Sequence, residues 1–160
     1  MAEQVLELPP LPDQKAKGWE FTDLSGLDID SYAPAAFEAK VEGAEGATVV
    51  SLAAARDSHP ELLAERLGAL VPGEDPFVAR NDASWADGVL VHVPAGVRVA
   101  EPITVEVPVD ADGGAISWRT LIVLEEGSEA EVWEHCSSAG DQTDALLNSV
   151  VELQMEGSIG

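Results

Sequence analysis

The sequence predicts a mainly β fold of stacked solenoid coils, preceded by a small N-terminal α/β region. From Val89 onward apolar residues tend to alternate with polar ones, which is the period of a β-strand. Gly96, Gly127 and Gly157 each mark a turn after an apolar strand, at spacings of 31 and 30 residues. Such a period is typical of coils that bury their inward faces only against their neighbours.

The alternation is clearest at Ile103, Val105 and Val107, which precede Pro108. Further sets that share one parity are Val97 and Val99; Ile116, Trp118, Ile122 and Leu124; and Val151, Leu153 and Met155. The parity before the third glycine is shifted by one relative to the second, so the coils are not perfect copies. An antiparallel sandwich of similar strands remains an alternative from periodicity alone.

Residues 1–45 are predicted to be an extended lead-in, because Pro9, Pro10 and Pro12 break any helix and glycines interrupt later periodicity. Trp19 and Phe21 stand two residues apart. In an extended strap both rings share one face, so we expect them to anchor the lead-in on the rest of the chain.

Residues 46–88 are predicted to form a small helical or mixed subdomain. Residues 48–52 (TVVSL) are a strand candidate. Ser58 and Glu61 have the spacing of a capping box, followed by Leu63, Leu67 and Leu70 at helical spacing. A second short helix is expected from residues 75–76 to about Trp85. Residues 89–160 then begin the coiled β core.

The composition narrows the possible partners. Asp and Glu number 30 against 8 Lys and Arg, so the formal net charge is −22. A polyanion repels phosphate backbones and anionic head groups, so neither nucleic acid nor membrane is expected as a partner. Residues 1–7 (MAEQVLE) show no signal peptide, and Cys136 has no cysteine to pair with. We expect a cytoplasmic protein.

Candidate chemical groups are few. His135 and Cys136 are the only metal or sulfur candidates, and neighbours on a strand point to opposite faces unless the strand bulges. His59 and His92 are interpreted as a first-turn helix residue and a packed strand residue. Asp110 and Asp112 are interpreted as turn residues rather than a calcium loop. Because common catalytic motifs are missing, we expect no enzyme and no cofactor bound by these residues.

The order of several segments resembles the N-terminal part of the SufB/SufD family of iron-sulfur cluster assembly scaffolds, and SufD most. The resemblance runs from about residue 17 to the end, and residues 87–103 are its most specific part. The segments are residues 18–24 (GWEFTDL), 59–63 (HPELL), 77–83 (FVARNDA), 87–97 (DGVLVHVPAGV), 101–103 (EPI) and 119–128 (RTLIVLEEGS). Arg80 stands where the family usually has an apolar residue.

The resemblance implies a right-handed parallel β-helix, of which residues 89–160 are the first coils, and a scaffold without enzymatic activity. It further implies a SufB-like paralogue as partner and a SufC-like ABC ATPase held by regions beyond residue 160. The full complex would assemble the iron-sulfur cluster, and no family site residue falls on this chain.

We also expect the chain to be truncated, because residues 158–160 (SIG) follow a strand and turn directly, without a capping element. The alternative from another class is a carbohydrate-binding or carbohydrate-processing β-helix. It rests on the acidic, strand-rich half and on Trp118 and Trp133, taken as exposed.

Overall fold

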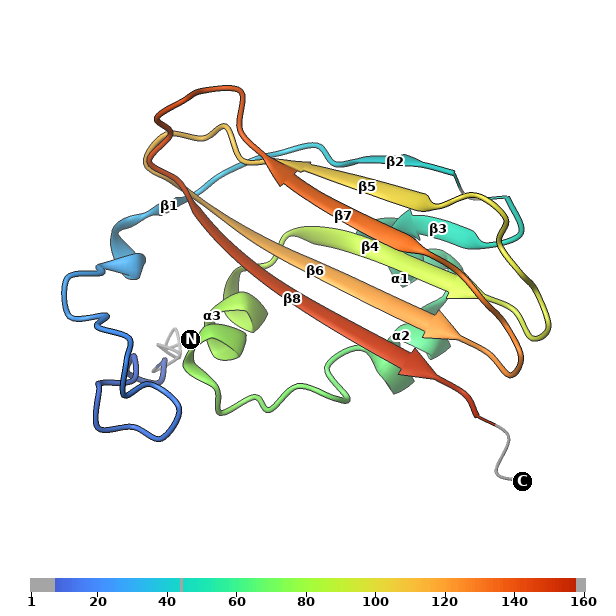
Figure 1. The fold of residues 1–160 in the computed structure, drawn as a ribbon, viewed down its shortest axis with the longest axis horizontal. Helices are drawn as coiled ribbons and strands as arrows, with labels where there is room; N and C mark the ends of the chain where they lie inside the picture. The colour runs from blue at the N-terminus through green and yellow to red at the C-terminus, as the bar shows by residue number, and fades with distance from the viewer. Residues whose placement is uncertain (1–7, 44, 158–160) are drawn as a thin grey trace, which may run out of the picture.

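The computed structural model describes residues 8–43 and 45–157 and contains two sheets with three short helices and a 3₁₀ turn (Figure 1). The 3₁₀ turn η1 is Ile29–Ser31, and the helices are α1 (Leu52–Ser58), α2 (Pro60–Arg66) and α3 (Pro76–Ser84). The strands are β1 (Ala33–Pro34), β2 (Lys40–Glu42), β3 (Thr48–Ser51), β4 (Asp87–Val93), β5 (Ile103–Pro108), β6 (Gly114–Leu124), β7 (Val132–Ser137) and β8 (Leu146–Met155). The fold is therefore mixed α/β, with its strands mainly in the second half.

Parallel pairing between strands about 30 residues apart organises both sheets. In the larger sheet β4 pairs with β6 and β6 with β8, so that Val91 lies beside Ile122 and Ile122 beside Leu153, each 31 residues further on. In the smaller sheet β5 pairs with β7, and Ile103 lies beside Val132, 29 residues further on. This parallel pairing excludes the antiparallel sandwich. Antiparallel pairs occur at the edges, where β3 joins β4 and β2 joins β5.

The shared parity of the apolar residues places them between the two sheets. Their inward side chains form one core, with Val105 and Val107 fully buried and Ile116 1% exposed. The 31-residue register also explains the parity shift before the third glycine. Leu124 and Met155 are partners on the same face, and only the turn that follows differs. Gly96 and Gly127 adopt left-handed φ values of 70° and 69°, whereas the φ of Gly157 lies outside that region.

The strand predicted around Val97 and Val99 is wrong, because this stretch is a loop that contributes one isolated bridge, from Arg98 to Glu129. Both valines still pack against the core from the loop. The alternation therefore identified the buried side chains correctly but not the backbone conformation, since a loop that follows the turn can also present alternate residues inward.

The helices cover the outer face of the larger sheet and form a second core with it (Figure 1). Leu52 and Ala55 of α1 and Leu63 of α2 pack against the outward residues Leu90, Leu121 and Val123. The third helix is tied to the sheet by a buried amide. Asn81 is fully buried and donates to the backbone carbonyls of Trp118 at 3.0 Å and Asn148 at 2.9 Å.

The capping box at Ser58 is wrong. The Ser58 hydroxyl donates to the Ala54 carbonyl, and the N-cap of α2 is His59, whose side chain makes no cap hydrogen bond. A helix already occupies residues 52–58 and is capped by Ser51, so Ser58 lies at its end. The leucine period also ends early, because α2 stops at Arg66 and Leu70 is 60% exposed. The helix predicted up to Trp85 is confirmed as α3, capped by Asp75.

The lead-in is a chain of turns rather than an extended strap, so its two aromatic rings do not share a face. Trp19 stacks on Phe77 of α3 with ring centroids 5.5 Å apart, whereas Phe21 is 99% exposed. Gly18, with φ of 93°, lies in these turns. Further along, β1 and β2 join the lead-in to the two sheets. Residues 1–7 and 158–160, on which the signal-peptide and chain-end expectations rest, lie outside the described residues.

Gly88 lies where β4 packs tightly against its neighbours. A Cβ there would lie 2.0 Å from the Arg119 carbonyl oxygen and 2.6 Å from Leu52 Cδ1. We expect Gly88→Ala to lower the free energy of unfolding by about 1–3 kcal/mol, because overpacking displaces the neighbouring strand and α1. Urea denaturation followed by circular dichroism measures this. Gly73→Ala is the control, since a Cβ at Gly73 meets nothing within 4 Å. Equal unfolding midpoints for the two variants would contradict the prediction.

Candidate functional site

A carboxylate lies on the inward side of β7, where the core would otherwise be apolar. Glu134 is the register partner of the buried Val105. It accepts hydrogen bonds from the Trp118 indole at 3.0 Å, from the Thr120 hydroxyl and from the Ser149 hydroxyl at 3.3 Å. These donors come from β6 and β8, so Glu134 links the two sheets. We call Glu134, Trp118, Thr120 and Ser149 the inner carboxylate cluster.

His135 and Cys136 lie next to this cluster but do not converge. Strand β7 keeps a regular register, so Cys136 faces the same side as Glu134, and His135 faces the opposite side. His135 stacks on Trp133, with centroids 6.4 Å apart. Partial desolvation, and then the charge of Glu134, raise the pKa of the Cys136 thiol. Within residues 8–43 and 45–157, no three His, Cys, Asp or Glu side chains gather closely enough to hold a metal ion.

The remaining candidate residues have local partners. The Nδ1 atom of His59 lies 2.8 Å from the Ser58 hydroxyl. Asp110 and Asp112 lie in the turn between β5 and β6, where they accept the backbone N–H groups of Ala139 and Asp144. Their oxygens thus connect two neighbouring loops, as turn residues do.

His92 joins β4 to the turn that follows β6. Its Nε2 donates to Glu125 at 2.8 Å, and the other oxygen of Glu125 accepts the Ala95 N–H at 2.9 Å. Both donors favour the charged carboxylate, so they lower the pKa of Glu125, with the His92 hydrogen bond as the larger cause. The turn after β6 is thereby fixed to the end of β4.

This pair makes stability depend on pH in a definite direction. Because the pKa of Glu125 is lowered in the folded state, its contribution is present above the ordinary carboxyl pKa and is lost as pH falls through the lowered value. We expect Glu125→Gln to be less stable than wild type at pH 7, with the difference shrinking toward pH 3. Thermal unfolding across this range measures it. The exposed neighbour Glu126→Gln is the control, and a difference independent of pH would refute the prediction.

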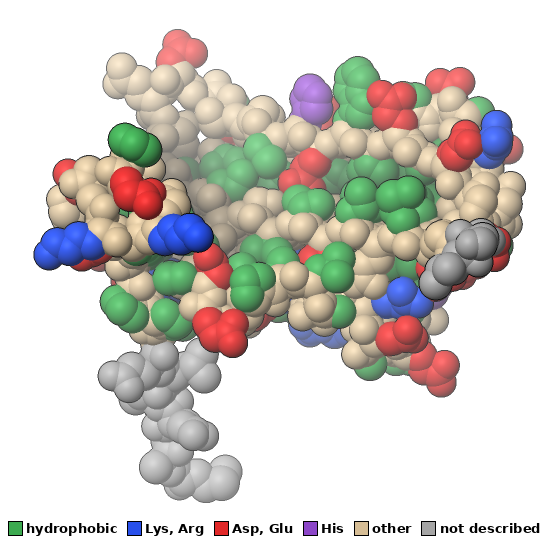
Figure 2. All heavy atoms as spheres, turned by 60° about the horizontal axis from the view of Figure 1, so that its bottom comes forward, with side chains coloured by type: hydrophobic (Ala, Val, Ile, Leu, Met, Phe, Trp, Pro, Cys, Tyr) green, Lys and Arg blue, Asp and Glu red, His purple; other side chains and the backbone are tan. Residues whose placement is uncertain are grey.

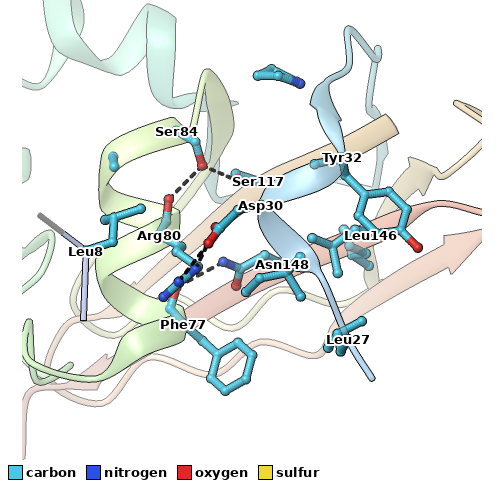
Figure 3. A pocket seen from close by; sticks show the side chains of 15 residues that line it. Leu8, Leu27, Asp30, Tyr32, Phe77, Arg80, Ser84, Ser117, Leu146 and Asn148 are labelled. Carbon is cyan, nitrogen blue, oxygen red and sulfur yellow. Dashed lines mark hydrogen bonds and ion pairs between the residues drawn. The ribbon is translucent and has the colours of Figure 1, made fainter. Parts of the chain in front are cut away.

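A cavity of about 350 Å³ lies between the lead-in, α3 and the first residues of β6 and β8 (Figure 3). Most of its wall is apolar. The apolar lining residues are Leu8, Leu27, Ile29, Tyr32, Pro34, Phe77, Ala83, Ala115, Leu146 and Leu147. We call this space the lead-in cavity. Its volume is at the lower end of the range for ligand pockets.

Arg80 lies in the wall of this cavity and holds the lead-in. Its guanidinium donates to both oxygens of Asp30, at 3.0 and 3.1 Å, and to the Pro9 carbonyl at 2.7 Å. The Arg80 hydrogen bond lowers the pKa of Asp30. An apolar side chain at position 80 could make none of these contacts, so in this chain the charge ties residues 9 and 30 to α3.

The two tryptophans on which the carbohydrate alternative rests differ in their exposure. Trp118 is 2% exposed and belongs to the core, so it is not available to a sugar, whereas Trp133 is 51% exposed. Among the described residues, no helix is both long and apolar enough to cross a bilayer.

The comparisons with known proteins agree with the resemblance in the sequence. The family model described as the SufBD protein N-terminal region matches residues 27–105. The chloroplastic iron-sulfur cluster assembly SufBD family protein ABCI8 of Arabidopsis thaliana is 34% identical over 126 residues, which are 78% of this chain and 23% of that protein. A SufBD family protein of Synechocystis is 33% identical over 110 residues, 68% of this chain and 23% of its own length.

The chain belongs to the SufBD family of iron-sulfur cluster assembly proteins. A third relative, from Mycobacterium tuberculosis, is 34% identical over 84 residues, which are 52% of this chain and 10% of that protein. The chain thus spans less than a quarter of the length of these three relatives.

Sequence reasoning missed Glu134 and Glu152, two acidic residues on strands that accept hydrogen bonds from other parts of the chain. Glu152 is 1% exposed and accepts the N–H groups of Gly68 and Leu70 at 2.8 and 3.2 Å. The signal in the sequence was the alternation along each strand. Glu134 lies two residues after Val132 and faces the same side, and Glu152 lies two residues after Val150 and faces the same side. In an acid-rich chain this signal is easily taken for surface charge.

Proposed function

We propose that this chain is the N-terminal part of a SufD-like scaffold protein that supports iron-sulfur cluster assembly without enzymatic activity of its own. The match of residues 27–105 to the SufBD N-terminal region carries the proposal. Its relatives from Arabidopsis and Synechocystis bear names that assign them to iron-sulfur cluster assembly. A SufB-like paralogue and a SufC-like ABC ATPase are the proposed partners, in the cytoplasm.

The proposed architecture is the first coils of a right-handed parallel β-helix. The parallel pairs β4–β6–β8 and β5–β7, with partners 31 and 29 residues apart, support it, because a coil of about that length connects the two sheets repeatedly. Val151, Leu153 and Met155 of β8 are 52%, 49% and 69% exposed on the inward-facing side. We propose that a further layer of the assembled protein covers them.

A scaffold role is also favoured by what the family motif does in the fold. In the most specific segment, Asp87 Oδ1 accepts the N–H groups of Ala53 and Gly88, at 3.1 and 2.8 Å. Gly88 permits the close approach to Arg119, and Val89 and Val91 are buried. Each of these residues either positions the backbone or fills a core. The segment therefore serves to pack the fold.

Co-purification tests the proposed partners. The complete reading frame, tagged and co-expressed with the SufB-like and ABC-type ATPase genes of the same genome, is expected to retain both on affinity and size-exclusion columns. The absence of both partners from the eluate when the tagged protein is omitted serves as the control. A tagged product that purifies alone, at any salt concentration tested, would argue against the scaffold assignment.

Cys136 and Glu134 provide a test of whether the inward side of β7 takes part in cluster assembly. If Cys136 handles sulfur or iron, Cys136→Ala in the complete complex will lower the cluster yield, measured by visible absorbance and iron content. Ser138→Ala, just after the end of β7, is the control. An unchanged yield would remove Cys136 as a candidate for cluster assembly.

Glu134→Gln is expected to lower the unfolding temperature, because it weakens the hydrogen bonds from Trp118 and Thr120.

A further inference from the structure

The outward face of the smaller sheet presents an exposed aromatic pair to solvent. The helices pack on the larger sheet, and the outward residues of β7, at positions 133, 135 and 137, are exposed. Trp133 is 51% exposed, and one of its ring faces stacks on His135, with centroids 6.4 Å apart. Among the described residues no other ring or cation lies over this indole. An exposed tryptophan of this kind is typical of contacts between proteins.

Two carboxylates lie on the same outward face as this indole. The Trp133 Nε1–H donates to Glu131 at 2.6 Å, which fixes the ring beside that carboxylate. Across the sheet the register places Thr104 beside Trp133 and Glu42 beside Thr104, so the three side chains form one outward row. Glu42 and Glu131 are both exposed, and within the part of the chain that the structure describes neither is ion-paired.

The bases near this row do not cancel its charge. Lys40 is the one Lys or Arg on the outward side of β2, β5 and β7, and its register partner is Glu106. Arg98, in the loop before β5, pairs with Glu129 at 3.0 Å. The chain as a whole carries a formal net charge of −22, and Figure 2 shows Asp and Glu side chains spread over the face turned forward there. The field over Trp133 therefore favours a cation.

We propose that this outward row binds an arginine-bearing segment of another protein, whose guanidinium stacks on Trp133 with the Glu131 and Glu42 carboxylates beside it. Arg fits better than Lys, because a planar guanidinium stacks on an indole and donates to a carboxylate at the same time. A protein segment fits better than a small molecule, because ligand pockets are concave and this sheet face is open. A neutral sugar gains nothing from the negative field. The proposal does not depend on the SufB-like and ATPase partners proposed above.

The test follows the indole signals of the isotope-labelled purified protein by NMR during titration with blocked pentapeptides. The chain has 4 Trp residues, and Trp133→Phe identifies the signal of Trp133. We expect acetyl-Arg-Gly-Arg-Gly-Arg-amide to shift this signal saturably, its Lys counterpart to bind about threefold more weakly, and its Glu counterpart not to bind. Added salt should weaken binding. An unshifted Trp133 signal, equal affinities for the Arg and Glu peptides, or a shift with cellopentaose but not with the Arg peptide overturns the proposal.

Variants locate the contact. Glu131→Gln and Glu42→Gln are each expected to weaken binding of the Arg peptide about threefold, whereas Glu61→Gln, at an exposed position of α2, is expected to leave it unchanged. Trp133→Leu should weaken binding about tenfold or more, and Trp133→Tyr less, as followed through the Thr104 backbone amide. Circular dichroism confirms that each variant is folded. Unchanged affinity in Trp133→Leu, or equal losses in Glu131→Gln and Glu61→Gln, overturns the proposal.

Discussion

The parallel register of β4, β6 and β8 is the constraint on which the rest of the structure depends. It places inward residues 31 positions apart in one row, so Val91, Ile122 and Leu153 stack on each other. Since the side-chain period of a strand is two, a shift by one residue would turn every inward side chain outward. The second core beneath α1 and α2 depends on the same register, because its sheet residues Leu90, Leu121 and Val123 have the opposite parity.

Buried polar groups fix the position of the helical layer on this sheet. Asn81 bonds to backbone carbonyls of β6 and β8, and Glu152 holds the chain that leaves α2. The buried Arg119 pairs with Asp82 of α3. Apolar packing alone is not directional, whereas these bonds accept few geometries. The segments of the chain that resemble the SufB/SufD family include Asn81, Asp82 and Arg119, so the resemblance reflects how the helices are attached to the sheet.

The inner carboxylate cluster and the lead-in cavity differ in character. The cluster lies between the two sheets, where Glu134 is held by donors from two strands, and Cys136 follows it on the same face. The cavity lies at the outer edge, under a lead-in that Trp19 and Arg80 attach to α3. The first joins the two sheets through hydrogen bonds. The second is enclosed mostly by apolar side chains.

The sequence by itself determined the strand-rich second half, the near-constant repeat and the family, because alternation and turn glycines are local signals. It also predicted α3, whose Asp75 cap and Pro76 define a start. The tertiary structure decided where α1 ends, since Ser58 suits a cap only if no helix precedes it. It also decided that Trp19 packs while Phe21 is exposed, and that Glu134 faces inward with partners. These outcomes depend on contacts between segments far apart in the chain, and a pattern of neighbouring residues does not contain them.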